Sequence, residues 1–201
     1  MWGGYGISIV IWAKDITISN NTIIDNTGTG LQGAGIVITS GHYPTAIDRI
    51  IIDSNNISGH TLGRGMDITV AASGTGGSLN ISNNIMTGNL YGIRYIHGFD
   101  NVIVSNNVLT GAKTADLYLQ SDVYGSNNIV GKYINYAPNG IISTINGKKI
   151  LYKPSAPAVG IWSVGDIVWN SAADNVLGWK CTGAGVDGGA TWKSMSITLE
   201  P

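Results

Sequence analysis

The sequence predicts an all-β fold in which a parallel β-helix is followed by a small C-terminal β-module. A Ser-Asn-Asn motif recurs five times between residues 19 and 128, at intervals of 35, 28, 23 and 21 residues. Apolar and polar residues alternate within each copy with the period of two that strands require. The chain has 29 Gly and 11% charged residues, as expected of a solenoid whose turns use Gly and Asn. Self-similarity at a period of twenty-odd residues indicates stacked coils.

The coils are predicted over residues 1–137. In each coil the Asn motif marks one strand, and a second strand follows with the pattern small–apolar–x–apolar. These second strands are Gly35–Thr39, Gly65–Thr69, Gly92–Ile96 and Asp116–Gln120. Longer loops are expected at Asn26–Gly30, Gly41–Thr45 and Ala71–Gly77. Loops that project from one side of a solenoid often line its binding face.

One Asn of each coil is expected to point inward at the bend, where stacked amides about 4.8 Å apart can satisfy one another and the buried turn backbone. The expected ladder consists of Asn21, Asn55, Asn84, Asn107 and Asn128. In the second copy Asn55 fits better than Asn56, because that copy is one residue shorter. This pattern indicates a structural role for these residues rather than a catalytic one.

Residues 138–157 are predicted to form a hairpin and a linker. Asn146-Gly147 separates the β-rich runs Ile141–Ile145 and Lys148–Tyr152, which is a strong tight-turn signal. Lys153–Pro157 reads as the linker. Residues 158–201 then hold four of the six Trp and are predicted to form five or six short strands.

Composition excludes several classes of function. A net charge of −1 leaves no basic stripe for nucleic acid and no attraction to an anionic membrane. No apolar run is long enough to insert into a bilayer. The lone Cys181 cannot form an internal disulfide and is expected to be a buried small hydrophobe. The chain opens already alternating like a strand, without a cap, so further coils are expected upstream of Met1.

When the second strands of successive coils are aligned, one column of outward-facing residues consists of Val37, Asp67, Arg94 and Tyr118. One interpretation is a surface ion pair between Asp67 and Arg94 worth less than about 1 kcal/mol. The other is a polysaccharide subsite, in which Asp67 acts as acid or base, Arg94 holds an acidic sugar and Tyr118 stacks on a ring. For a lyase, a base is expected among Arg64, Arg94 and His97, with His60 nearby.

A glycosidase needs two carboxylates roughly 5–10 Å apart, and no convincing pair emerges. All but one of the 12 acidic residues are Asp, and the exception is Glu200 near the end. The other β-helix candidates are Asp25, Asp53, Asp100, Asp116 and Asp122. No nucleophile elbow, phosphate loop or metal cluster is present, so no cofactor and no metal are expected.

The four C-terminal Trp are Trp162, Trp169, Trp179 and Trp192. They can form the core of the small module. Alternatively, exposed members can stack on sugar faces, and Trp169 and Trp179 are the candidates for that role.

Two parts of the sequence resemble known families. The Ser-Asn-Asn coils, over residues 5–133, are similar to the pectate-lyase-like, single-stranded, right-handed β-helices. The tail resembles a module found at the C-terminus of bacteriophage tailspikes, through Trp-x-x-Gly-Asp-x-Val at 162–168, Gly-Trp-x-Cys-Thr at 178–182 and Thr-Trp-Lys at 191–193. The resemblance implies an intertwined homotrimer on a virion tail that binds bacterial surface polysaccharide, attached through an upstream part of the same chain. It carries no catalytic residue over to this sequence.

The sequence therefore predicts the C-terminal part of a tailspike that recognises capsule or O-antigen and supports trimer assembly. One alternative is a complete polysaccharide depolymerase, either hydrolase or lyase, active within this chain. A second is a carbohydrate-binding module of a secreted enzyme, which would be monomeric and would expose two or more of the tail Trp in a row.

Overall fold

The computed structural model describes residues 4–10, 12–25, 33–39, 47–70, 76–135, 141–145, 148–172 and 176–196. Over these residues the α-helix is absent and the chain is built from strands, which confirms the all-β prediction. The chain divides into two compact units, Met1–Gly140 and Ile141–Pro201. Most of the three predicted loops lies outside the described residues, although Gly76 and Gly77, expected in the third loop, belong to a strand.

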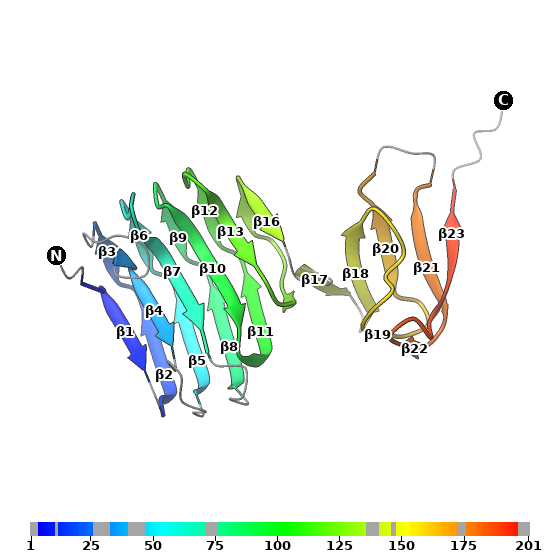
Figure 1. The fold of residues 1–201 in the computed structure, drawn as a ribbon, viewed down its shortest axis with the longest axis horizontal. Coiled ribbons are helices and arrows are strands. Elements are labelled where there is room, and N and C mark those ends of the chain that lie inside the picture. The colour runs from blue at the N-terminus through cyan, green and yellow to red at the C-terminus, as the bar shows by residue number, and fades with distance from the viewer. Residues whose placement is uncertain are drawn as a thin grey trace. The chain divides into compact units, whose positions relative to one another are not determined.

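The first unit consists of three sheets whose neighbouring strands are parallel (Figure 1). Sheet A contains β1 (Ile7–Val10), β4 (Ile36–Thr39), β7 (Arg64–Thr69), β10 (Tyr91–His97), β13 (Ala115–Leu119) and β16 (Tyr133–Asn135). Sheet B contains β2 (Lys14–Ser19), β5 (Asp48–Asp53), β8 (Gly76–Ser82), β11 (Phe99–Ser105) and β14 (Val123–Tyr124). Sheet C contains β3 (Thr22–Ile24), β6 (Asn56–Ser58), β9 (Ile85–Thr87), β12 (Val108–Thr110) and β15 (Ile129–Val130).

This stacking is consistent with a parallel β-helix, and each coil contributes one strand to each sheet. The predicted second strands are confirmed as β4, β7, β10 and β13 of sheet A. The Asn motif proves to mark a bend between two strands, the sheet B strand before it and the sheet C strand after it. The sequence predicts only one strand there, because the sheet C strands have only two or three residues and lack a full alternating pattern.

The predicted Asn ladder is present. The side-chain amide of each ladder Asn donates to the Oδ1 of the next at 3.0 Å, from Asn21 through Asn55, Asn84 and Asn107 to Asn128. The backbone N–H groups of the same residues donate to the same Oδ1 atoms at 2.9–3.0 Å. These bonds satisfy amides that would otherwise be orphaned inside the coil.

The residue before each ladder Asn adopts the left-handed conformation, with φ between 55° and 58°. This residue is Asn in four coils and Ser54 in the second. Asn tolerates this conformation better than most residues, which explains the second position of the Ser-Asn-Asn motif. In the second coil Asp53 stands opposite Ser19 and Ser82. The residues there that correspond in position to Ser-Asn-Asn of the other coils are therefore Asp53, Ser54 and Asn55.

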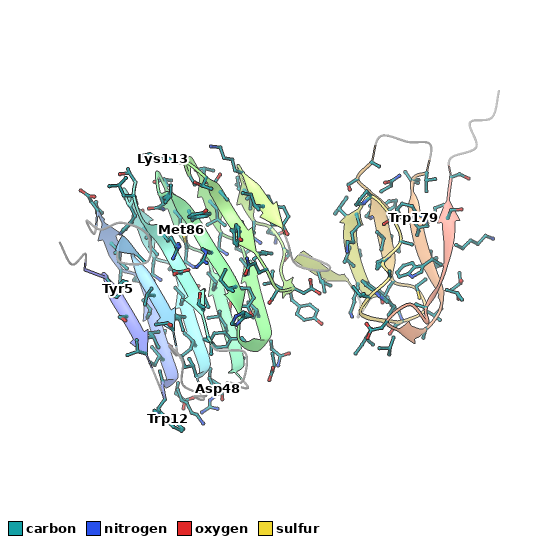
Figure 2. The ribbon with its side chains drawn as sticks, in the orientation of Figure 1. Tyr5, Trp12, Asp48, Met86, Lys113 and Trp179 are labelled. Atoms are coloured by element: carbon teal, nitrogen blue, oxygen red, sulfur yellow. The ribbon has the colours of Figure 1, made fainter. Side chains whose placement is uncertain are left out.

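Aliphatic side chains from all three sheets fill the coil interior. Beneath the outer face of sheet A, Ile38, Ile68, Tyr95 and Leu119 follow one another in register and are at most 1% exposed. Met86, labelled in Figure 2, is equally buried and lies on sheet C. Because protein interiors are close-packed, the buried row from Ile38 to Leu119 gives the outer face of sheet A a rigid base.

The second unit is a mixed sheet with a small strand pair. The predicted hairpin is confirmed as β17 (Ile141–Ile145) paired antiparallel with β18 (Lys148–Lys153), while its turn residues, 146–147, lie outside the described residues. β18 continues the sheet through β20 (Ile167–Asn170), β21 (Gly178–Gly183) and β23 (Thr191–Met195). β19 (Ile161–Trp162) pairs with β22 (Gly185–Val186). The hairpin therefore shares a sheet with the C-terminal module.

The core of this unit contains Ile142, Leu151, Trp162, Val168 and Cys181. Cys181 is fully buried as expected, and burial raises the pKa of its thiol. The Gly-Asp pair of the tail motif has a structural role. Asp166 is 1% exposed, and its carboxylate accepts backbone N–H bonds from Lys149 at 2.9 Å and Ser163 at 2.8 Å.

Candidate functional site on sheet A

The predicted outward column on sheet A is present in register. Val37 stands opposite Asp67, Asp67 opposite Arg94, and Arg94 opposite Tyr118. Neighbouring members are one strand spacing apart, about 4.8 Å. The column therefore brings side chains from four coils together on one face.

Asp67 lies between two arginines and is only 2% exposed. Arg64 Nη1 donates to Asp67 Oδ2 at 2.6 Å, and Arg94 Nη1 donates to Asp67 Oδ1 at 2.7 Å. Both carboxylate oxygens are thus engaged by charged donors, which are the stronger kind of hydrogen bond. Two positive charges share one negative charge, so the group carries a net positive charge.

Two tyrosines complete the group. The guanidinium of Arg64 lies 5.8 Å from the ring centroid of Tyr91, and that of Arg94 lies 5.9 Å from the centroid of Tyr118. The two rings meet edge to face at 5.7 Å, a favourable arrangement for an aromatic pair. We call these five residues, Arg64, Asp67, Tyr91, Arg94 and Tyr118, the Arg–Tyr cluster.

A groove of about 290 Å³ adjoins the cluster. Its lining consists of Tyr5, Val37, Thr39, Asp67, Thr69 and Arg94. Tyr5, labelled in Figure 2 just before β1, is 41% exposed. The groove therefore runs from an aromatic ring on the first coil to a guanidinium on the fourth sheet A strand.

Three buried polar atoms on these strands lack a hydrogen-bond partner in the part of the chain that the structure describes. They are Arg64 Nε, Thr69 Oγ1 and His97 Nδ1. His97 stands opposite Thr69 in register, after an irregularity in β10. Unsatisfied groups of this kind cost about 1–3 kcal/mol each, and such a cost in a native structure calls for an explanation, for example a ligand.

The other predicted carboxylates do not share this face. Asp53 and Asp100 belong to sheet B, Asp25 follows β3 of sheet C, and Asp122 follows β13. Asp116 is on β13 but is 1% exposed, and it accepts backbone N–H bonds from Ala112 at 2.7 Å and Lys132 at 2.6 Å. Of the described residues, Asp67 is the one carboxylate that lines the groove.

His60 lies inside the coil, away from this face. It is 1% exposed, and its Nδ1 is 3.0 Å from Asn89 Oδ1. Burial lowers the pKa of its imidazole, while the hydrogen bond with Asn89 and the charge of Asp25 act in the opposite direction. His60 is thus part of the bend rather than of the groove.

The tail Trp do not form an exposed row among the described residues. Trp162 is 2% exposed, and its ring meets that of Trp192 at 5.3 Å. Trp179, labelled in Figure 2, also packs against the core. Trp169 lies on the opposite face of the sheet, since Val168, its neighbour in β20, is buried in the core. The two Trp expected to contact substrate are therefore on different faces.

The sequence patterns described above do not single out Tyr91, Tyr5 or the two groove threonines. Tyr91 could have been found by extending the predicted strand one residue toward the N-terminus, which places it opposite Arg64. Thr39 and Thr69 follow from strand alternation, two residues after Val37 and Asp67. Tyr5 precedes the first strand, so no repeat pattern covers it.

This arrangement is suited to binding. Each arginine donates one N–H to Asp67 and retains other donors, beside aromatic rings and threonine hydroxyls. Asp67 is fully paired, and no second carboxylate lines the groove among the residues that the structure describes, which does not fit the two-carboxylate chemistry of glycosidases.

Among the described residues, no cluster of His, Cys, Asp or Glu could hold a metal ion. The described residues also include no helix of the length and apolarity needed to cross a membrane. No family model, curated protein or solved structure matches the chain.

Proposed function

We propose that the chain binds an extended bacterial surface polysaccharide along the face of sheet A, as the C-terminal part of a bacteriophage tailspike. The Arg–Tyr cluster beside the groove carries this proposal. Rings supply surfaces for sugar rings, and arginine N–H groups suit the carboxylate of an acidic sugar. Stacked parallel strands repeat these groups along the coil axis, as an extended polymer requires.

The tailspike context comes from the sequence resemblance. In this context the coil winds right-handed, because crossovers between parallel strands almost always do. The protein then acts on a virion tail outside the host cell, as a homotrimer. Apolar side chains that remain exposed on sheets B and C provide surface for subunits to cover, including Ile103 at 45% and Ile129 at 61% exposure.

The proposal is for recognition rather than cleavage by Asp67. A carboxylate that is 2% exposed and held by two guanidinium groups is poorly placed to exchange a proton with substrate. Its role is to fix the orientation of Arg64 and Arg94. A depolymerase within this chain would need acids outside the groove.

The test is binding to a panel of purified capsular and O-antigen polysaccharides, with reducing-end release and unsaturated-uronate absorbance measured in parallel. Arg94→Ala is expected to weaken binding by about tenfold or more, since a hydrogen bond to a charged group is worth about 1.5–3 kcal/mol. Arg49→Ala is the matched control, because Arg49 is also paired with an aspartate but lies on sheet B. Equal affinity of Arg94→Ala and the wild-type protein would rule out this face.

A further inference from the structure

The C-terminal sheet has an outer face, opposite the face that carries Leu151, Val168 and Cys181 of the core. Residues in register across the sheet share a face. One outer row consists of Tyr152, Trp169, Gly178 and Met195. The adjacent outer row consists of Ile150, Ile167, Lys180 and Lys193.

The first row is an aromatic platform. Tyr152 is 73% exposed and stands beside Trp169, one strand away. On the other side of Trp169 lies Gly178, which has no side chain. A Cβ at Gly178 would come within 3.2 Å of the Met195 methyl group. The row therefore presents two rings side by side, bordered by a thioether.

The second row contains a pair of positive charges that face each other. Lys180 and Lys193 stand directly opposite each other on β21 and β23, and both are exposed. Like charges in this relation destabilise a sheet. Neither lysine has a carboxylate within ion-pair distance among the described residues; the ion pairs found there involve Arg49, Arg64 and Arg94. Local conflicts of this kind are expected at functional sites.

We infer that this outer face is a second site, which binds an acidic glycan. Sugar rings stack on Tyr152 and Trp169, and a sugar carboxylate lies between Lys180 and Lys193, where it relieves their repulsion. A nucleic acid fits less well, because it carries a phosphate at every residue and requires a longer basic stripe. The inference concerns only the C-terminal unit and does not depend on the sheet A site.

The test uses the full chain and two carboxylated probes, oligogalacturonate and a hyaluronan oligosaccharide, with methyl-esterified oligogalacturonate as the neutral probe. The wild-type chain is expected to bind at least one carboxylated probe and to bind the methyl ester more weakly. Trp169→Ala and Lys193→Glu are each expected to weaken binding by about tenfold, the effect of losing 1.4 kcal/mol. Lys113→Glu makes the same charge change at an exposed lysine of the first unit and is expected to leave binding unchanged.

Lys193→Glu also separates loss of binding from loss of folding. It converts the repulsive cross-strand pair into an attractive one, so its midpoint of thermal unfolding is expected to rise as binding falls. The inference is overturned if neither carboxylated probe binds, if the methyl ester binds equally well, or if Lys193→Glu binds like the wild type. Trp169→Ala and Lys193→Glu are also measured in an Arg94→Ala background, where the sheet A site is weakened and their effect is expected to persist, so either proposal can fail without the other.

Discussion

At the level of single residues, Asn55 and Asn56 are adjacent and chemically identical, yet they occupy opposite environments. Asn55 is 1% exposed, and its side-chain amide donates to Ile18 O at 2.9 Å and to Asn84 Oδ1 at 3.0 Å. Asn56 is exposed at the start of β6. Asn55→Ala leaves several buried groups unpaired, so we expect it to lower the free energy of unfolding by about 3 kcal/mol or more.

Asn56→Ala is the matched control, with an expected change within about 0.5 kcal/mol, as for most surface substitutions. Chemical denaturation of both variants checks the prediction. Equal losses would mean that the second coil is registered one residue away from the structure described above. The ladder could be predicted from sequence because a buried amide at a repeating bend has few other partners.

Among the structural elements, the bends that follow β6 and β9 hold His60 and Asn89, in successive coils. His60 N donates to Asn89 Oδ1 at 3.1 Å. The pKa of buried His60 lies below its ordinary value of 6.5, chiefly because of desolvation. The unfolded chain therefore binds a proton first as the pH falls. Stability contributed by the neutral imidazole is complete above pH 6.5 and declines below it.

We expect His60→Asn to reduce this acid sensitivity, because an amide at this position can donate to Asn89 without titrating. The measurement is the free energy of unfolding at pH 7.5 and pH 5 for both proteins. A wild-type stability that is the same at both pH values, or a difference that persists fully in the variant, would contradict the assignment.

The strands show what sequence patterns can and cannot specify. The sheet A strands and the hairpin were predictable because alternation and turn residues are local signals. The short sheet C strands were missed because each is defined by its parallel neighbours. The column of Asp67, Arg94 and Tyr118 followed from register alone. By contrast, the second ion pair of Asp67, with Arg64 three residues earlier on the same strand, depends on how the side chains pack, which strand alternation does not encode.

For the whole molecule, the proposed assembly makes a prediction of its own. Exposed apolar residues recur along sheet B, where Ile51, Ile103 and Tyr124 are 42%, 45% and 39% exposed. Association would remove this surface from water, at roughly 25 cal/mol per Å² of apolar area. We expect light scattering to give three times the mass of one chain. A monomer across the micromolar range would contradict the trimer and favour an appended carbohydrate-binding module.

Hydroxyl-radical footprinting would show whether polysaccharide lies along sheet A. The chain would be labelled with and without the panel polysaccharide that it binds most tightly. We expect Tyr91 and Tyr118 to become protected, while Trp12, which is 71% exposed between β1 and β2, remains reactive. Protection of Trp12 with Tyr91 and Tyr118 unchanged would place the polymer elsewhere on the chain and contradict binding along sheet A.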